Sequence, residues 1–237
     1  MLTILIGRAK TGKSDTILRR MAELGESSQQ ILLVPEHASH QAEVDVCRAC
    51  GDTASRHAEV LSFRRLGERV LSITGGIADV TLDNGGKLLT LQRALLETAP
   101  QMTVYRKPSQ KVGFLEQMLA LFDELRSYEV TPEILYRQAQ DIDGSTHDKL
   151  TDLSLLYAAY AARLRRPGLD ARDRMTKLCD HLEESGYVRG KDIFIDGFTY
   201  FNAQERRALA VFLRQARSVT VTLLGEVNSR EEILNPR

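Results

Sequence analysis

The chain has 237 residues, of which 43% are hydrophobic and 27% charged, which is typical of a globular protein with one large core or two small ones. Its 32 basic and 32 acidic residues cancel, so no global basic field indicates nucleic acid, although a local patch is not excluded. No apolar run is long enough for a membrane span, and no basic segment precedes the first apolar stretch as in a signal peptide. Three cysteines without an export signal favour a reducing, cytoplasmic setting.

Residues 1–76 alternate between short apolar runs and amphipathic segments. The predicted strands are Leu2–Ile6, Ile31–Val34 and Glu59–Ser62, and the predicted helices are Lys13–Leu24, Ala38–Cys50 and Phe63–Ile73. This alternation predicts an α/β fold in which helices cover both faces of a parallel sheet. Right-handed crossovers then bring the loops after the strands to the carboxyl edge of the sheet, where ligands bind in such folds.

The segment between the first strand and the first helix has the pattern of a phosphate-binding loop. Its residues fit G-x-x-x-x-G-K-S/T and are Gly7, Arg8, Ala9, Lys10, Thr11, Gly12, Lys13 and Ser14. The glycines let backbone N–H groups point at phosphates, Lys13 reaches the β- and γ-phosphates, and the Ser14 hydroxyl ligates Mg²⁺. The helix that follows adds the positive end of its dipole. We therefore expect ATP and Mg²⁺ here, and the alternative is an ordinary glycine-rich turn. Lys10 is either a further phosphate contact or simply exposed.

Residues 77–190 are predicted to be almost purely helical, and their apolar stripes favour a core over a base-stacking platform. Thr131-Pro132 predicts an N-cap with proline at the first helical position. Asp170 is expected to cap a later helix that Gly186 ends. The other expected helices are Gly86–Thr98, Phe114–Tyr128 and a long helix with a stripe from Leu150 to Leu164 that Pro167-Gly168 closes.

Residues 191–226 return to the α/β pattern. The predicted elements are a strand at Ile193–Asp196, a helix at Ala203–Gln215 with Asn202 and Glu205 as a capping box, and a strand at Val219–Leu224. We therefore expect one nucleotide-binding domain, made of residues 1–76 and 191–226, which a helical insertion at 77–190 splits. Residues 227–237 form a polar tail.

Asp196 is the candidate for a second part of the nucleotide site. It ends the apolar strand at the Walker B position, where an acidic residue holds the metal ion. The next residue is Gly197, which cannot polarise water, whereas many helicases and ATPases have a glutamate there. Gln204 and Glu205 are tentative catalytic candidates, since spacing alone does not bring them to the site. The alternative for Asp196 is a turn residue, because Asp-Gly is a strong turn signal.

Several segments in chain order resemble the N-terminal part of the AddB (RexB-like) subunit of bacterial ATP-dependent helicase/deoxyribonucleases. After the glycine-rich loop these are Ile31–His37 (I-L-L-V-P-E-H), Glu59–Leu66 (E-V-L-S-F-R-R-L), Lys149–Tyr157 (K-L-T-D-L-S-L-L-Y) and Asp196–Glu205 (D-G-F-T-Y-F-N-A-Q-E). The resemblance implies a RecA-like P-loop NTPase domain of the superfamily 1 helicase type with a helical subdomain inserted in it. It also implies an AddA-type partner, DNA as the substrate of the complex, and a role in processing double-strand ends for recombinational repair.

Members of this family are several times longer than this chain. The chain lacks a second motor domain and the nuclease domain with its iron–sulfur cluster, so we expect an excised domain or a truncated product. Alone, it is expected to bind nucleotide, with weak or no ATPase activity and no unwinding or cleavage of DNA.

Other patterns leave alternatives open. Cys47 and Cys50, flanked by His40 and His57, form a conceivable zinc site, but cysteines with this spacing on a helix are more often buried residues. Arginines on helix faces could contact DNA phosphates or be solvated; they are Arg64, Arg65, Arg69, Arg163, Arg165, Arg166, Arg172 and Arg174. The rival functions are a P-loop kinase for a small molecule or nucleotide, and a DNA-binding protein with a vestigial loop.

Overall fold

The computed structural model describes residues 1–76, 82–106, 112–166, 169–170 and 174–225. These residues form two compact units. Unit 1 holds residues 1–76, 174–201 and 205–225. Unit 2 holds residues 82–106, 112–166, 169–170 and 202–204.

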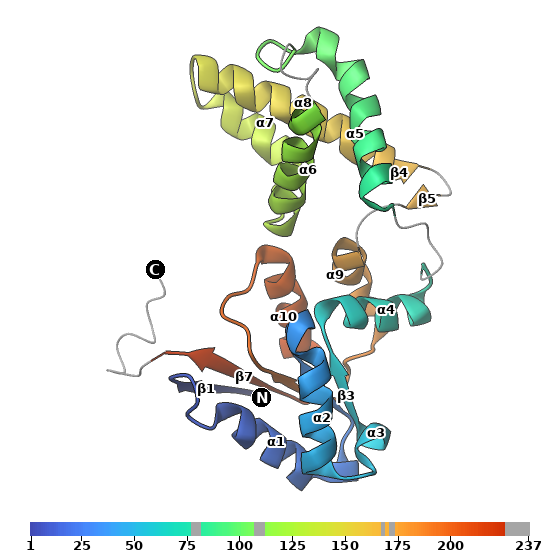
Figure 1. The fold of residues 1–237 in the computed structure, drawn as a ribbon, viewed down its shortest axis with the longest axis vertical. Coiled ribbons are helices and arrows are strands. Elements are labelled where there is room, and N and C mark those ends of the chain that lie inside the picture. The colour runs from blue at the N-terminus through green and yellow to red at the C-terminus, as the bar shows by residue number, and fades with distance from the viewer. Residues whose placement is uncertain (77–81, 107–111, 167–168, 171–173, 226–237) are drawn as a thin grey trace. The chain divides into compact units, whose positions relative to one another are not determined.

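Unit 1 is built on a five-stranded parallel sheet, which confirms the predicted α/β fold (Figure 1). The strand order is β1-β7-β6-β2-β3, so the last two strands of the chain lie between the first two. The strands are β1 (Leu2–Gly7), β2 (Gln30–Leu33), β3 (Ala58–Leu61), β6 (Asp192–Ile195) and β7 (Ser218–Leu224). The third strand ends one residue before its predicted end because Ser62 caps the next helix, where its side chain accepts a hydrogen bond from the Arg65 N–H.

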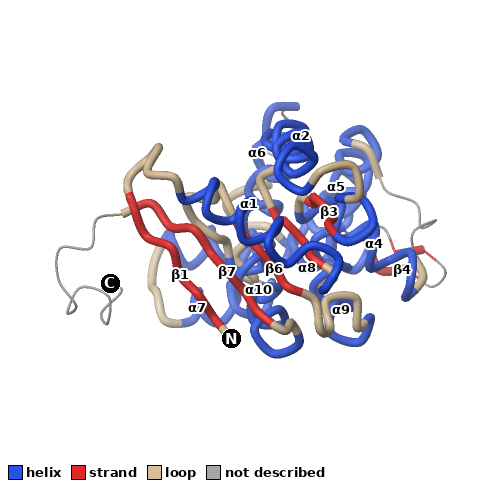
Figure 2. Tube along the Cα trace, turned by 90° about the horizontal axis from the view of Figure 1, so that it is seen from below, coloured by secondary structure: helices blue, strands red, loops and turns tan. Residues whose placement is uncertain are grey.

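Helices cover both faces of this sheet. They are α1 (Lys13–Leu24), η1 (Gly25–Ser27), η2 (Glu36–Ala38), α2 (Ser39–Cys50), α3 (Ala54–His57), α4 (Phe63–Thr74), α9 (Arg174–Ser185) and α10 (Ala203–Gln215). Residues of α4, α9 and α10 pack on one face against Leu33 and Ile195, and residues of α1 and α2 pack on the other against Leu32 and Phe194. Consecutive residues of the central strands are therefore both buried, as in a sheet with two covered faces. Figure 2 shows the strands between these helices.

The start of α9 differs from its prediction. Asp170 does not cap this helix, because it lies in a short strand where it pairs with Arg165, and α9 begins only at Arg174. The sequence places α9 in the helical block, but in the structure it packs against α4 in unit 1. At Gly67 on α4 the two helices come close, and a Cβ there would lie in ordinary van der Waals contact, 3.5 Å from the Arg174 carbonyl oxygen. The predicted end of this helix is confirmed, because α9 ends at Ser185, directly before Gly186.

Unit 2 is mostly helical. Its elements are α5 (Asn84–Thr98), η3 (Ala99–Gln101), α6 (Val112–Ser127), α7 (Pro132–Gln140), α8 (Ser145–Leu164), β4 (Arg165–Arg166) and β5 (Leu169–Asp170). The predicted apolar stripes form one core, in which Phe122 stacks on Tyr157 with ring centroids 4.7 Å apart. Thr131 caps α7 as predicted, whereas the sequence did not predict the β4–β5 pair.

Two predicted features, the Pro167-Gly168 stop and the polar tail at 227–237, lie outside the described residues. Within the described part of the chain, no helix has the length and apolar character needed to cross a membrane.

Candidate functional site at the carboxyl edge of the sheet

The Gly7–Ser14 segment joins the end of β1 to the start of α1. Its backbone is left-handed at two positions, Lys10 with φ 60° and Gly12 with φ 80°. Gly12 is the N-cap of α1, and no side chain among the described residues caps this helix. The N–H groups of the first turn therefore keep their capacity to bind an anion.

The side chains of this segment fold back on its own backbone. Lys13 Nζ donates to the carbonyl oxygens of Gly7 at 2.8 Å and Arg8 at 2.6 Å, and Thr11 Oγ1 donates to the Arg8 carbonyl at 2.9 Å. Gly7 is required by this packing, because a Cβ at its position would lie 2.6 Å from Thr11 Oγ1. The ammonium group of Lys13 is thus held over the loop by carbonyl groups that a phosphate can replace, while Ser14 lies in the first turn of α1.

Asp196 lies on the same face of the sheet as this segment. It follows β6 two residues after Phe194, which packs under α1, and Thr222 Oγ1 on β7 donates to Asp196 Oδ1 at 2.5 Å. The strand register pairs Thr222 with Leu5, which also packs on the α1 side and lies two residues before Gly7. β7 is the one strand between β1 and β6. The glycine-rich loop follows β1 and Asp196 follows β6. Because neighbouring strands of a sheet lie about 4.8 Å apart, β1 and β6 are about 10 Å from each other.

Gly197 takes a conformation that favours glycine. Its φ is +80°, and a Cβ at this position would lie 3.3 Å from Cδ of Pro35, the residue that follows Val34 after β2. Gly197 has no side chain that could act as a general base. The missing Cβ also lets the end of β6 pass close to Pro35.

The carboxyl ends of β2 and β3 carry a cluster that sequence reasoning did not identify. Glu36 accepts hydrogen bonds from Arg64 Nε at 3.0 Å and Nη2 at 2.6 Å, and from the Ser62 hydroxyl. The bonds from Arg64 and Ser62 lower the pKa of Glu36, and Glu36 raises that of Arg64. In the sequence, Glu36 stands directly after Val34-Pro35 at the end of a predicted strand. This position indicates a polar residue but does not predict its hydrogen-bond partners.

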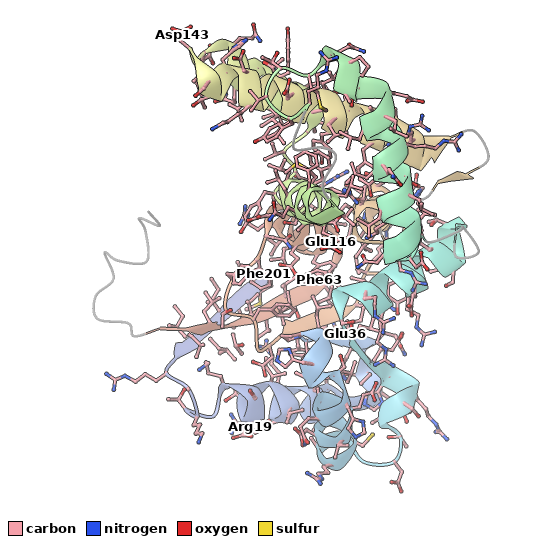
Figure 3. The ribbon with its side chains drawn as sticks, turned by 45° about the horizontal axis from the view of Figure 1, so that its top comes forward. Arg19, Glu36, Phe63, Glu116, Asp143 and Phe201 are labelled. Carbon is pink, nitrogen blue, oxygen red and sulfur yellow. The ribbon has the colours of Figure 1, made fainter. Side chains whose placement is uncertain are left out.

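Aromatic side chains lie beside this cluster. Phe198 is edge-on to Phe63 at 5.7 Å between ring centroids and 5.1 Å from Phe201. Glu36, Phe63 and Phe201, labelled in Figure 3, come from the segments after β2, β3 and β6. The segments after β3 and β6 therefore pack together through their aromatic rings, and the buried Phe63 stands between Ser62 and Arg64, the two residues that bond to Glu36.

The tentative catalytic candidates lie in the first turn of α10. Gln204 is buried and Glu205 is half-buried, and both have interactions within the protein. Their catalytic role stays a prediction.

Five of the arginines considered for DNA contact are paired with carboxylates, whereas the side chain of Arg166 and the whole of Arg172 lie outside the described residues. Arg64 bonds to Glu36 and Glu68, and Arg65 bonds to Glu43. Arg69, Arg163 and Arg174 pair with Glu59, Glu97 and Glu68. Exposed ion pairs contribute about 0–1 kcal/mol, so such pairs can exchange partners.

The cysteines of the conceivable zinc site lie on α2, where Cys47 is exposed and burial raises the pKa of Cys50. The described residues bring together no group of three or more His, Cys, Asp or Glu side chains that could hold a metal ion. His57 is buried, and neither of its ring nitrogens has a hydrogen-bond partner among the described residues.

These observations define an α/β protein whose parallel sheet presents a glycine-rich loop, a lysine and a carboxylate at one edge. A sequence model of the family described as "ADDB, N-terminal" matches residues 4–235. The chain therefore belongs to the AddB N-terminal family, which confirms the resemblance found in its motifs.

Curated relatives agree with this assignment. A subunit of the ATP-dependent helicase/deoxyribonuclease of Clostridium kluyveri is 32% identical over 98% of this chain and 21% of its own length. Proteins of the same name from Clostridioides difficile and Desulforamulus reducens are 31% and 36% identical, each over 94% of this chain and 20% of their length. The chain thus spans about a fifth of the length of these relatives.

Proposed function

We propose that this chain is a RecA-like, P-loop nucleotide-binding region of an AddB-type subunit, with ATP and Mg²⁺ bound at Gly7–Ser14. The observation that supports the proposal is the position of Asp196 after β6, on the same sheet face as the glycine-rich loop and with β7 as the one strand between them. A hydroxyl from Ser14 and a carboxylate from Asp196 are oxygen ligands of the kind that Mg²⁺ prefers. When bound, the ion would neutralise phosphate charge.

Each residue of the loop has a binding role in this proposal. Lys13 exchanges its carbonyl partners for phosphate oxygens, and the N–H groups between Gly7 and Ser14 donate to the phosphates. Gly197 stands at the position where many helicases and ATPases have a glutamate that activates water. We therefore propose weak or no ATP hydrolysis by the chain alone, with Glu205 as the remaining candidate for a base and Gln204 as a candidate to orient the attacking water.

The wider role follows the relatives' name. We propose that the longer protein acts with an AddA-type helicase/nuclease subunit on DNA ends in the bacterial cytoplasm, in double-strand-break repair, and that this region contributes nucleotide binding and not unwinding or cleavage. The match along nearly the whole chain supports this role over a P-loop kinase.

Thermal unfolding tests nucleotide binding. A ligand at 100 times its Kd stabilises the folded state by about 2.7 kcal/mol, which for a chain of this size raises Tm by roughly 5–10 °C. We expect such a rise with millimolar ATP and Mg²⁺, and its loss in Lys13→Ala. Arg19→Ala is the matched control, because it removes an exposed cation from the same helix, outside the Gly7–Ser14 loop (Figure 3).

Three results would contradict the proposal. The first is no rise in Tm for the unmodified chain, and the second is an equal rise in Lys13→Ala. The third is rapid transfer of phosphate to a metabolite, which would favour a kinase. If nucleotide has no effect and the chain alone binds DNA tightly with a steep salt dependence, the loop is vestigial and DNA binding is the primary function.

A further inference from the structure

The last turn of α2 carries two cysteines that the nucleotide-binding proposal does not use. Cys47 and Cys50 are three residues apart, so their side chains lie on the same side of the helix. Cys47 is exposed, whereas Cys50 is half-buried and packs against the core beneath α1 and α2. Burial and, after it, the charge of an ionised Cys47 raise the pKa of Cys50, so the two sulfur atoms lie within electrostatic reach of each other.

Cys47 also lines a cavity of about 630 Å³ that α2, α3, β3 and α4 enclose. The lining carries both signs of charge, since it includes the ion pairs Arg65–Glu43 and Arg69–Glu59. Of the two thiols of α2, only that of Cys47 belongs to a residue of this described lining. A cavity of this volume admits a small organic molecule, so a dissolved reagent reaches Cys47 before Cys50.

The end of α2 leaves room for the two sulfur atoms to approach. In a regular helix the Cβ atoms of residues three apart are about 5–6 Å from each other, whereas a disulfide needs about 3.5–4.5 Å. Cys50 is the last residue of α2, and Gly51 after it has φ +75° with nothing within 4 Å of the position of a Cβ. Residues 51–53 are exposed. A hydrogen bond of 2.9 Å from the Gly51 N–H to the Cys47 carbonyl closes this turn. The helix can therefore adjust at its open end by the 1–2 Å or so that a disulfide requires.

We propose that Cys47 and Cys50 form a reversible thiol–disulfide exchange site that reacts with low-molecular-weight disulfides. The Cys47 thiolate attacks one sulfur of a disulfide RSSR, the S–S bond breaks, and RS⁻ leaves and takes up the proton that Cys47 has lost. The product is a mixed disulfide between Cys47 and RS. Cys50 then loses its proton and attacks Cys47 Sγ, and the second RS⁻ leaves with that proton. In sum, two protein thiols are oxidised to one disulfide, and RSSR is reduced to two RSH. A dithiol reductant reverses both steps.

The environment of each thiol sets this order of attack. Cys47 is the accessible thiol, so it meets the reagent first. Once it is a mixed disulfide it carries no charge, which removes one of the two causes that raise the pKa of Cys50. Cys50 is then held one turn away from the sulfur that it attacks. Neither residue belongs to the Gly7–Ser14 loop, and the proposal does not depend on nucleotide binding.

Oxidised glutathione is the probe for this site, with intact-mass and peptide-mass analysis of the 237-residue chain. The unmodified chain is expected to lose two hydrogens and to give a peptide in which Cys47 is linked to Cys50. Cys50→Ser is expected to keep a glutathione adduct at Cys47. Cys47→Ser is expected to react at least about 10-fold more slowly than Cys50→Ser, because it retains only the half-buried thiol. The buried Cys179 should stay unmodified in every variant, which verifies that each one is folded.

A displaced thiol is the matched control. A double variant with Cys47→Ser and Arg48→Cys keeps an exposed thiol on α2, but residues two apart on a helix do not face each other. It should accumulate the glutathione adduct at position 48 without forming a link to Cys50.

Four results would overturn the proposal. They are a lasting adduct at Cys47 in the unmodified chain, equal rates in Cys47→Ser and Cys50→Ser, a disulfide that joins two chains, and an equally fast link to Cys50 in the double variant.

Discussion

The Thr222 hydroxyl donates a 2.5 Å hydrogen bond to Oδ1 of Asp196, from the strand that lies between the glycine-rich loop and that carboxylate. Thr222 is buried, so this bond fixes the orientation of the Asp196 carboxylate. One oxygen of Asp196 is held by the protein, and the proposed role of the carboxylate toward Mg²⁺ depends on that orientation.

Thr222→Val should weaken the metal-dependent part of nucleotide binding. Valine keeps the shape and removes the donor, so about 1 kcal/mol of positioning is lost, or roughly fivefold in affinity for Mg·ATP. Stabilisation by ATP in EDTA should not change. Isothermal titration with and without Mg²⁺ measures both. Thr220→Val is the matched control, since Thr220 is buried two residues away on the same strand and its hydroxyl has no partner among the described residues. Equal losses in the two variants would contradict a positioning role for Thr222.

The sequence predicted the elements whose signals are local. α1 and α10 have their predicted bounds, because glycine, proline and capping residues at helix ends act over a few positions. The edge of the sheet that carries Asp196 was also predictable, because the carboxyl ends of parallel strands meet at one edge.

The sequence did not predict the partners that hold the site. Thr222 and Asp196 are 26 positions apart, and Ser62 and Glu36 are also 26 apart, so no local pattern links them. The available signal was the alternation of threonine with valine in β7, which places polar side chains on one buried face. Asp170 was misassigned because Asp is favoured at helix caps, whereas the pairing of β4 with β5 places it in a short strand.

Gly197→Ala should destabilise the protein more than Gly190→Ala. Both glycines have positive φ, +80° and +72°, where alanine costs about 1 kcal/mol. A Cβ at Gly190 meets nothing within 4 Å, whereas at Gly197 it lies 3.3 Å from the Pro35 ring. We expect a loss of about 2 kcal/mol for Gly197→Ala, including this overpacking. Urea unfolding measures both values, and equal losses would show that Pro35 yields without cost.

Asp192 should contribute to stability in a way that depends on pH. It is buried at the start of β6 and accepts hydrogen bonds from Arg217 Nε at 3.1 Å, Ser218 Oγ at 2.6 Å and the Ser28 hydroxyl. Burial alone would raise the pKa of Asp192, but the hydrogen bonds, led by that from Arg217, lower it below its ordinary value. A lowered pKa in the folded state gives stability that is present above about pH 4 and is lost as pH falls through the folded-state value.

Asp192→Asn should therefore lower the free energy of unfolding at pH 7, and the difference from the unmodified chain should shrink below about pH 4. Denaturant unfolding from pH 7 to pH 3 measures this difference. Asp52→Asn, at an exposed position, is the control and should follow the unmodified chain. A difference that stays constant across the range would exclude a titrating role for Asp192.

Asp152 should hold the segment after η3 to α8 in unit 2. This buried carboxylate accepts from the N–H groups of Thr103 at 3.0 Å, Val104 at 2.7 Å and Tyr105 at 2.9 Å. In Asp152→Asn one oxygen becomes a donor, so at least one buried N–H loses its acceptor at a cost of about 1–3 kcal/mol. The amides of residues 103–105 should then exchange faster with solvent, while those of β6 in unit 1 keep their protection.

Hydrogen exchange of both units measures this effect, with Asp143→Asn as the control because Asp143 is exposed in the same unit (Figure 3). Asp152 lies in the Lys149–Tyr157 segment that carries part of the family resemblance. A structural clamp explains an aspartate on the buried side of a helix without any contact to nucleotide or DNA. Unchanged exchange at residues 103–105 would remove that explanation, and a fall in ATP-induced stabilisation in Asp152→Asn would connect the residue to the nucleotide site instead.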